Sequence, residues 1–263
     1  MPVAGIDVGS LTAKAVIVEN GEILGSAVVP GSPRPGESAT LALGKALENA
    51  GVKREAITYI VGTGYGRKQI GNVNEVHSEI ACHARGAYQR LPSVRTVIDI
   101  GGQDAKAARI AEGGAVARYA YNDKCASGTG RFLEVMAEAL EKPIETLGDL
   151  ALSASGSVRI SNQCVVFAET EVISLVNKGI ELGSIIRGLH EALAGRVAAL
   201  ARSIGVEKEV CFTGGVAKNK GVAKALEDAL GVPLRFLDLD PQITGAYGAA
   251  LLAEEATMQK KSA

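Results

Sequence analysis

Two segments of this sequence place an aspartate at the end of an apolar run and follow it with a glycine-containing turn. Asp7 precedes VGSLTAK (8–14), and Asp99 precedes IGGQD (100–104). A glycine in such a turn lets backbone N–H groups face an anion without a Cβ in the way. An aspartate at the end of a buried strand suits a Mg²⁺ ion held through water. The two turns therefore predict contacts to phosphate and magnesium.

The first turn carries further groups that could bind phosphate. Gly9 would present its backbone, Ser10 and Thr12 would add hydroxyl donors, and Lys14 would add positive charge. The alternative interpretation is an ordinary hairpin with a solvated aspartate. The second turn in the same chain favours the phosphate site.

The second turn is predicted to hold the other side of the phosphates through Gly101 and Gly102. Gln103 or Asp104 could orient the water that attacks the terminal phosphate, as side chains do in other phosphoryl-transfer sites. The sequence does not choose between them. Lys106 repeats Lys14, and it could equally be a solvated strand residue.

The two turns belong to an internal repeat. Residues 5–21 (GIDVGSLTAKAVIVENG) align without gaps on residues 97–113 (VIDIGGQDAKAARIAEG), and both copies contain the aspartate, the first turn glycine and the lysine. This density of identity indicates a duplicated unit. We expect the two turns to face each other across a pseudo-twofold cleft.

A third glycine turn follows the apolar run 210–213. It contains Gly214, Gly215, Val216 and Ala217, and its two glycines would let the backbone approach an adenine ring and its sugar closely. The segment 62–68 (GTGYGRK) looks like a Walker loop, but Arg67 and Gln69 break the required spacing. It is predicted to be a loop lining the cleft or a surface turn.

The elements that must position these turns follow an α/β pattern, in which apolar runs bounded by glycines alternate with amphipathic stretches. The strands are predicted at 3–8, 13–19, 22–29, 57–62, 95–100, 104–111, 114–121, 208–213 and 233–237. The helices are predicted at 37–50, 76–90, 129–141, 168–178, 183–204, 217–230 and 244–256, with a loose tail after them.

Composition excludes several classes of protein. The chain has 263 residues and a formal net charge of −1, so no general attraction to nucleic acid or an anionic membrane is expected. It lacks an apolar run of roughly 18 residues and a basic leader, which predicts a cytoplasmic protein. In that compartment its four cysteines are expected to be thiols or metal ligands and not disulfides.

The four cysteines fall into two kinds. Cys82 and Cys211 lie in apolar segments and are expected in the core, and His83, beside Cys82, has no partner that suggests a ligand cluster. Cys125 and Cys164 lie in polar loops that each precede a predicted helix, where the helix N-terminus favours a thiolate. Two thiolates are half of what a [4Fe–4S] cluster needs, and a twofold homodimer would supply four. Ordinary loop cysteines are the alternative.

The three glycine turns resemble those of the actin, sugar-kinase and heat-shock-chaperone ATPase superfamily. The resemblance implies an α/β fold of two ribonuclease-H-like subdomains with ATP or ADP and Mg²⁺ between them. The first subdomain would comprise residues 1–94 and 244–260, and the second residues 95–243 with the cluster-binding loops. The final helix would cross back to the first half.

A narrower resemblance rests on GIDVGS, TGYGR, VIDIGGQD, NDKCASGTGRFLE, CVVFAETEVISL and FTGGVAKN in this order. Together they are similar to the activator component of 2-hydroxyacyl-CoA dehydratases, a family that also includes ATPase subunits of benzoyl-CoA reductases and reductases of double-cubane-cluster proteins. The resemblance implies an oxygen-sensitive homodimer with one bridging [4Fe–4S] cluster, held by Cys125 and Cys164 of each chain. It also implies that ATP hydrolysis drives electron transfer from a ferredoxin or flavodoxin to an iron–sulfur dehydratase or double-cubane-cluster protein.

Two other functions are compatible with the nucleotide turns. One is a small-molecule kinase of the same superfamily, such as a pantothenate kinase, and the other is an actin-like filament former. Neither function needs Cys125 or Cys164 in those loops.

Overall fold

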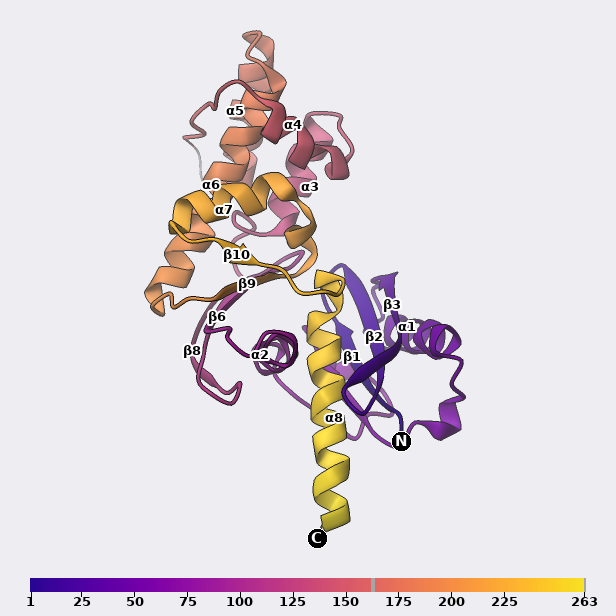
Figure 1. Ribbon diagram of the computed structural model, residues 1–263. Helices are drawn as coiled ribbons and strands as arrows, with labels where there is room; N and C mark the ends of the chain where they lie inside the picture. Colours follow the sequence, from indigo (N-terminus) through magenta and orange to yellow (C-terminus); the bar gives the residue numbers. More distant parts are fainter. Residues whose placement is uncertain (162–163, 263) are drawn as a thin grey trace.

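The computed structural model describes residues 1–161 and 164–262, which form two lobes, each built around a five-stranded mixed sheet. Two helices, α2 (Glu79–Arg90) and α8 (Thr244–Ser262), lie where the lobes meet, and α8 continues along the first lobe (Figure 1). The predicted α/β class is therefore confirmed. No helix among the described residues is long and apolar enough to cross a bilayer.

The sheet of the first lobe has the strand order β3-β2-β1-β4-β5. Its strands are β1 (Val3–Val8), β2 (Thr12–Glu19), β3 (Glu22–Pro30), β4 (Ile60–Thr63) and β5 (Glu75–Val76). The first three strands are antiparallel, and β4 pairs parallel to β1. Helix α1 (Pro35–Ala50) packs against β1, β2 and β3, while α8 packs against β1, β2 and β4. Short 3₁₀ turns span Arg54–Ala56 and Arg67–Gln69.

The sheet of the second lobe repeats this plan, in the order β8-β7-β6-β9-β10. Its strands are β6 (Thr96–Ile100), β7 (Ala105–Ile110), β8 (Val116–Asn122), β9 (Val210–Thr213) and β10 (Leu234–Arg235). The register is repeated as well, because Asp7 lies opposite Lys14 on β1 and β2, and Asp99 lies opposite Lys106 on β6 and β7. The duplication seen in the sequence thus extends to topology and pairing.

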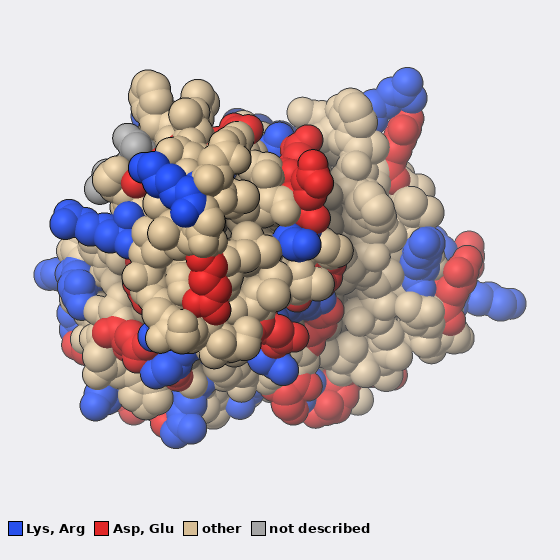
Figure 2. Space-filling model, turned by 90° about the horizontal axis from the view of Figure 1, so that it is seen from above, with Lys and Arg blue, Asp and Glu red and all other residues tan. Residues whose placement is uncertain are grey.

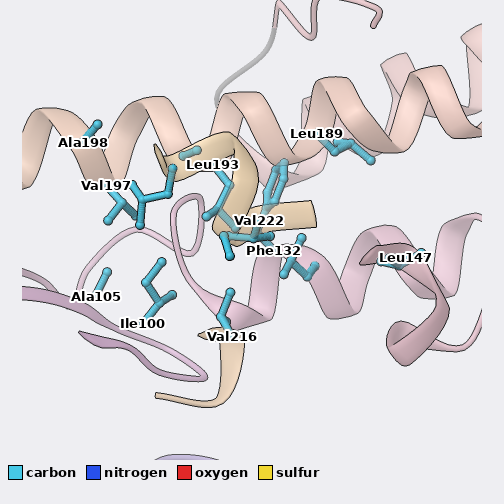
Figure 3. Packing of buried hydrophobic residues seen from close by; sticks show 14 of the residues in the cluster. Ile100, Ala105, Phe132, Leu147, Leu189, Leu193, Val197, Ala198, Val216 and Val222 are labelled. Carbon is cyan, nitrogen blue, oxygen red and sulfur yellow. The ribbon is translucent and has the colours of Figure 1, made fainter. Parts of the chain in front are cut away.

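Most of the remaining helices belong to the second lobe. They are α3 (Gly130–Ala139), α4 (Leu147–Ser153), α5 (Val165–Asn177), α6 (Leu182–Ser203) and α7 (Lys220–Leu230), with 3₁₀ turns at Ile144–Thr146, Gly215–Lys218 and Pro241–Ile243. The long helix α6 buries Leu193 and Val197 in the cluster that contains Ile100 of β6 and Phe132 of α3 (Figure 3). This packing fixes α3 and α6 relative to the end of β6.

The two crossing helices touch through glycines. A Cβ on Gly248 would lie 1.8 Å from the carbonyl oxygen of Cys82, and one on Gly86 would lie 2.5 Å from that of Thr244. Only glycine permits such an approach, so backbone packs directly on backbone where α2 meets α8. The expectation of a loose tail MQKKSA (258–263) is wrong for residues 258–262, because α8 continues as helix to Ser262. The segment after residue 251 contains no Gly or Pro to end the helix.

The division into two domains at residues 94/95 and 243/244 stays a prediction. The two sheets fall on either side of residue 95, and α8, although last in the chain, packs on the first sheet.

Candidate functional site

A cleft of about 590 Å³ lies between the two lobes and is lined by both acidic turns. Figure 2 shows the groove between the lobes, with acidic side chains (red) along its margin. Most of the predicted nucleotide-binding residues line this cleft, namely Asp7, Gly9, Ser10, Thr12, Lys14, Asp99, Gly101, Gly102, Gly214, Gly215 and Val216. Ala217 lies next to them in the chain and is buried.

The two aspartates lie at equivalent positions and are both almost completely buried. Lys14 Nζ lies 3.4 Å from Asp7 Oδ2, and Lys106 Nζ lies 3.5 Å from Asp99 Oδ2. Burial alone would raise the pKa of Asp99, but the nearby charges of His83, Lys106 and Lys14 lower it below its ordinary value. Asp99 is therefore a carboxylate, which is the form that can accept hydrogen bonds from metal-bound water.

Lys106 is a buried residue with three acidic neighbours. Its Nζ lies 2.5 Å from Asp104 Oδ2 and 2.7 Å from Glu79 Oε2, in addition to Asp99. Burial lowers the pKa of Lys106, but the three carboxylates outweigh that effect and raise it. The alternative of a solvated strand lysine is thus wrong.

The two candidates for orienting water do not line the cleft. Asp104 is engaged by Lys106, and Gln103 is exposed to solvent. Glu79, the first residue of α2, does line the cleft and was not singled out from the sequence. Burial raises its pKa, although the adjacent Lys106 opposes that effect. A sequence signal was present, because Ser78 directly before it is the N-cap of α2.

His83, one turn further along α2, lies between the two aspartates. Its Nδ1 is 3.2 Å from Thr213 Oγ1 and 3.5 Å from Asp99 Oδ1. A Cβ built on Gly245 would lie 2.8 Å from His83 Nε2 and 3.1 Å from Asp7 Oδ2, which places the imidazole near both carboxylates. His83 therefore has two polar partners, Thr213 and Asp99, which come from strands far away in the chain.

The loop of residues 62–68 is the structural counterpart of the third glycine turn. Thr63 pairs with Asp7 as Thr213 pairs with Asp99, and each threonine is followed by a glycine with positive φ. A Cβ on Gly64 would lie 2.5 Å from Asp7 Oδ1, and one on Gly214 would lie 2.6 Å from Asp99 Oδ1. The loop of residues 62–68 does not line the cleft. It packs against the Asp7 turn on the side away from the cleft.

The four cysteines separate as predicted into a buried pair and an exposed pair. Burial raises the pKa of Cys82 and of Cys211 to about 12, so both stay protonated thiols. Cys164 is the N-cap residue of α5. The pKa of Cys125 is lowered, first by its hydrogen bond with Ser127 and further by Arg196.

The Cys125 loop is connected directly to the second acidic turn. The backbone N–H of Gly130 donates to the carbonyl of Gly101 at 2.8 Å, and that of Arg131 donates to Gly102 at 2.7 Å. These donors are at the start of α3, five and six residues after Cys125. The turn predicted to hold phosphate and the loop that carries the exposed thiol are therefore adjacent parts of one hydrogen-bonded unit.

The two exposed cysteines belong to loops that border one cavity. This cavity measures about 630 Å³ and is lined by Ser127 and Gly128 from one loop and by Ile160 and Ser161 from the other. Within residues 1–161 and 164–262, no three His, Cys, Asp or Glu side chains are grouped to hold a metal ion. An exposed pair of thiols fits a cluster only if a second chain completes the ligand set.

Comparison with known proteins gives matches over almost the whole chain. Residues 4–253 match the BadF/BadG/BcrA/BcrD ATPase family. The activator of lactoyl-CoA dehydratase from Anaerotignum propionicum is 46% identical over 256 residues, which cover 97% of this chain and 98% of that protein. The (R)-2-hydroxyglutaryl-CoA dehydratase activating ATPase from Acidaminococcus fermentans is 45% identical, with 95% of each chain covered.

Solved structures agree with these sequence matches. The activator of 2-hydroxyisocaproyl-CoA dehydratase from Clostridium difficile, with bound ADPNP, superposes with a TM-score of 0.94 at 40% identity, covering 100% of this chain and 98% of that one. A glucokinase of the ROK family from Streptomyces griseus superposes with a TM-score of 0.60 at 17% identity, covering 97% and 100%. The second likeness concerns the fold alone, and it confirms the predicted actin-like and sugar-kinase architecture.

Proposed function

Because the chain belongs to the BadF/BadG/BcrA/BcrD ATPase family, we propose that it is the ATP-hydrolysing activator of an iron–sulfur 2-hydroxyacyl-CoA dehydratase. In this proposal ATP hydrolysis drives the transfer of low-potential electrons to the dehydratase. The observation that carries the proposal is the pair of hydrogen bonds from the start of α3 to Gly101 and Gly102. They connect the nucleotide cleft to the loop of an exposed thiol, which a simple kinase or filament protein does not need.

The cleft residues have separate tasks in hydrolysis. Asp7 and Asp99 hold Mg²⁺ through water, and Lys14 with the turn backbones of residues 9–12 and 101–102 neutralises the phosphates. Gly214, Gly215, Val216 and Ala217 form the nucleoside side of the site.

Glu79 is the better candidate for orienting the attacking water, ahead of Gln103 and Asp104. Its carboxylate is in the cleft and is held by Lys106, whereas the other two side chains are outside the lining. Lys106 in turn links Glu79 to Asp99, so the water-orienting group and the metal-binding group share one cation.

Cys125 and Cys164 of two identical chains are the proposed ligands of one [4Fe–4S] cluster, which supplies one-electron redox chemistry when bound. Both thiols are exposed, as a site between chains requires. The N-terminus of α5, which begins directly after Cys164, favours negative charge there, whereas the N–H groups of Thr129 and Gly130 already donate to Ala126 and Gly101. The sulfur ligands call for a reducing compartment, so the cytoplasm is the proposed location, with a ferredoxin or flavodoxin as donor.

The acceptor is proposed to be a dehydratase in preference to a double-cubane-cluster protein. Three relatives between 41% and 46% identical carry the name of a dehydratase activator. A benzoyl-CoA reductase subunit from Thauera aromatica is less similar, at 35%.

The experiment uses protein purified without oxygen and two groups of variants. We expect brown wild-type dimer with four irons, and Cys125→Ser or Cys164→Ser should lose the colour whereas Cys211→Ala keeps it. Asp7→Ala should lose ATP hydrolysis by about 100-fold or more and keep the colour. Asp238→Ala removes an exposed carboxylate and is the matched control. A colourless wild-type protein that phosphorylates a small molecule would contradict the proposal.

A further inference from the structure

The Cys125 loop is fastened to the long helix α6 by one side chain. Arg196 Nη1 donates to the carbonyl oxygen of Ser127 at 3.4 Å, donates to the Ser127 hydroxyl, and lies 3.7 Å from Cys125 Sγ. The Ser127 hydroxyl is itself 2.9 Å from the same sulfur. A guanidinium group and a hydroxyl group therefore converge on the sulfur from the protein side.

The rest of the loop is shaped to keep this contact. Asn122 binds the backbone of Cys125 through both halves of its amide group, at 2.7 and 3.2 Å. Gly128 has a φ of 103°, and a Cβ there would lie 3.6 Å from Arg196 Cβ, so the turn rests directly on α6. Ser127 is 3% exposed, which keeps water from competing for its hydroxyl.

We propose that Arg196 is a positioning residue that fixes Cys125 through Ser127 and stabilises negative charge on this ligand and on the cluster it holds. This inference rests on the proposed function, in which Cys125 is a cluster ligand. The contact of Arg196 is with the proposed ligand, at 3.7 Å from its sulfur. Its role differs from that of the cleft residues, because it concerns the reduction potential and not hydrolysis.

The physical reason is the charge that reduction adds. A reduced cluster carries one more negative charge than an oxidised one, so a fixed cation beside a ligand stabilises the reduced form and raises the potential. All three contacts come from one nitrogen of the guanidinium group, Nη1, which faces the loop carbonyl, the hydroxyl and the sulfur together. Cys164 is the N-cap of α5 and has different surroundings, so the two thiols of one chain should respond differently to changes at Arg196.

The first experiment uses iron-free, reduced protein and measures alkylation of the two exposed thiols by iodoacetamide at one pH, with peptide mapping. Arg196→Gln should change the reaction rate of Cys125 and not that of Cys164, because the contacts that position the Cys125 sulfur are lost. Arg196→Lys should keep the rate within about threefold, since the charge remains. Arg187→Gln removes an exposed arginine of the same helix, paired with Glu191, and should change neither rate.

The second experiment uses the cluster-loaded dimer and measures its midpoint potential by redox titration followed by electron paramagnetic resonance. Arg196→Gln should lower the ratio of reduced to oxidised cluster about tenfold at a fixed potential, which is about 59 mV for one electron. In Arg196→Lys the ratio of reduced to oxidised cluster should be close to that of the wild-type protein. In Arg187→Gln it should equal the wild-type ratio. Thermal unfolding of each variant checks that the fold is intact.

The outcomes separate the two proposals. A wild-type dimer without iron contradicts the proposed function, and the alkylation experiment still tests the contact between Arg196 and Cys125. A wild-type dimer with a cluster whose potential is the same in Arg196→Gln, together with an unchanged Cys125 rate, overturns the role of Arg196 and leaves the proposed function standing. If Arg196→Gln does not fold, a wild-type Cys125 rate together with a wild-type potential in Ser127→Ala, which removes the hydroxyl between Arg196 and the sulfur, would overturn it.

Discussion

Among single residues, Gly64 and Gly214 perform equivalent tasks in the two lobes. Each has a positive φ, of 98° and 88°, and each leaves room for an aspartate oxygen within 2.6 Å of where a Cβ would be. A side chain at either position would have two effects: it would strain the backbone, and it would displace the carboxylate of Asp7 or Asp99. The acidic residues are therefore positioned by neighbours that have no functional group of their own.

The Gly64 position allows a direct test. Gly64→Ala should lower the free energy of unfolding by about 2–3 kcal/mol and abolish ATP hydrolysis, because the new Cβ overlaps Val8 O and Asp7 Oδ1. Urea unfolding and steady-state hydrolysis are the measurements. Gly51→Ala is the control, since Gly51 also has a positive φ but has open space around it. It should cost about 1 kcal/mol and leave hydrolysis intact. Normal hydrolysis in Gly64→Ala would contradict this account of the Asp7 turn.

Among the elements, α3 is the one that joins the cleft to the surface. Its first residue, Gly130, lets the helix approach the second acidic turn so closely that a Cβ would lie 2.9 Å from the carbonyl oxygen of Gly101. Phe132 and Leu133 of α3 are held in the core cluster that also contains residues of α6. Displacement of the turn must therefore move α3, and with it the loop that precedes α3.

Widening this contact should affect nucleotide binding. Gly130→Ala is expected to destabilise the protein by about 1–3 kcal/mol and to weaken binding of ADPNP, because α3 and the turn must separate. Calorimetric titration and thermal unfolding measure the two effects. Gly44→Ala is the matched control in α1, where, within the described part of the chain, the new Cβ would have no neighbour within 4 Å beyond the adjacent residues and the backbone of its own helix. It should stabilise the helix by about 0.5–1 kcal/mol. Unchanged ADPNP affinity in Gly130→Ala would show that the turn tolerates the shift.

For the molecule as a whole, the lobes differ in what supports them. The first sheet is covered by two helices, whereas the second carries a stack in which α6 packs on α4 and α7. His190 of α6 lies inside that stack at 1% exposure, and its Nδ1 has no hydrogen-bond partner among the residues that the structure describes. A buried neutral imidazole of this kind makes the stability of the fold depend on pH.

Acid should unfold the protein partly through His190. Burial lowers its pKa from 6.5 to about 4, so the unfolded chain binds a proton at higher pH than the folded chain does. The stabilising contribution is complete above pH 6.5 and is lost as the pH falls toward 4, by about 3 kcal/mol in total. Urea unfolding at several pH values should show a smaller slope over this window in His190→Gln. Equal slopes in His190→Gln and in the wild-type protein would exclude His190 as the cause.

The sequence predicted the features that are local and repeated. The acidic turns, the lysines opposite them and the exposed cysteines could be recognised because each depends on a few adjacent residues. Glu79 and His83 were missed, because their partners Lys106 and Thr213 are brought close only by the folded sheets. The short elements α4 and β5 were missed as well, since seven and two residues hold too little periodicity to indicate a helix or a strand.

The unequal burial of the four cysteines also makes the chain convenient for spectroscopy. Cys82 and Cys211 are sealed inside and remain protonated, while Cys125 and Cys164 face solvent. A nitroxide or a fluorescent dye added to iron-free protein therefore attaches at two known points without any engineering of the sequence. Distances between those two labels, measured with and without nucleotide, would show whether the Cys125 loop moves relative to the Cys164 loop when nucleotide binds.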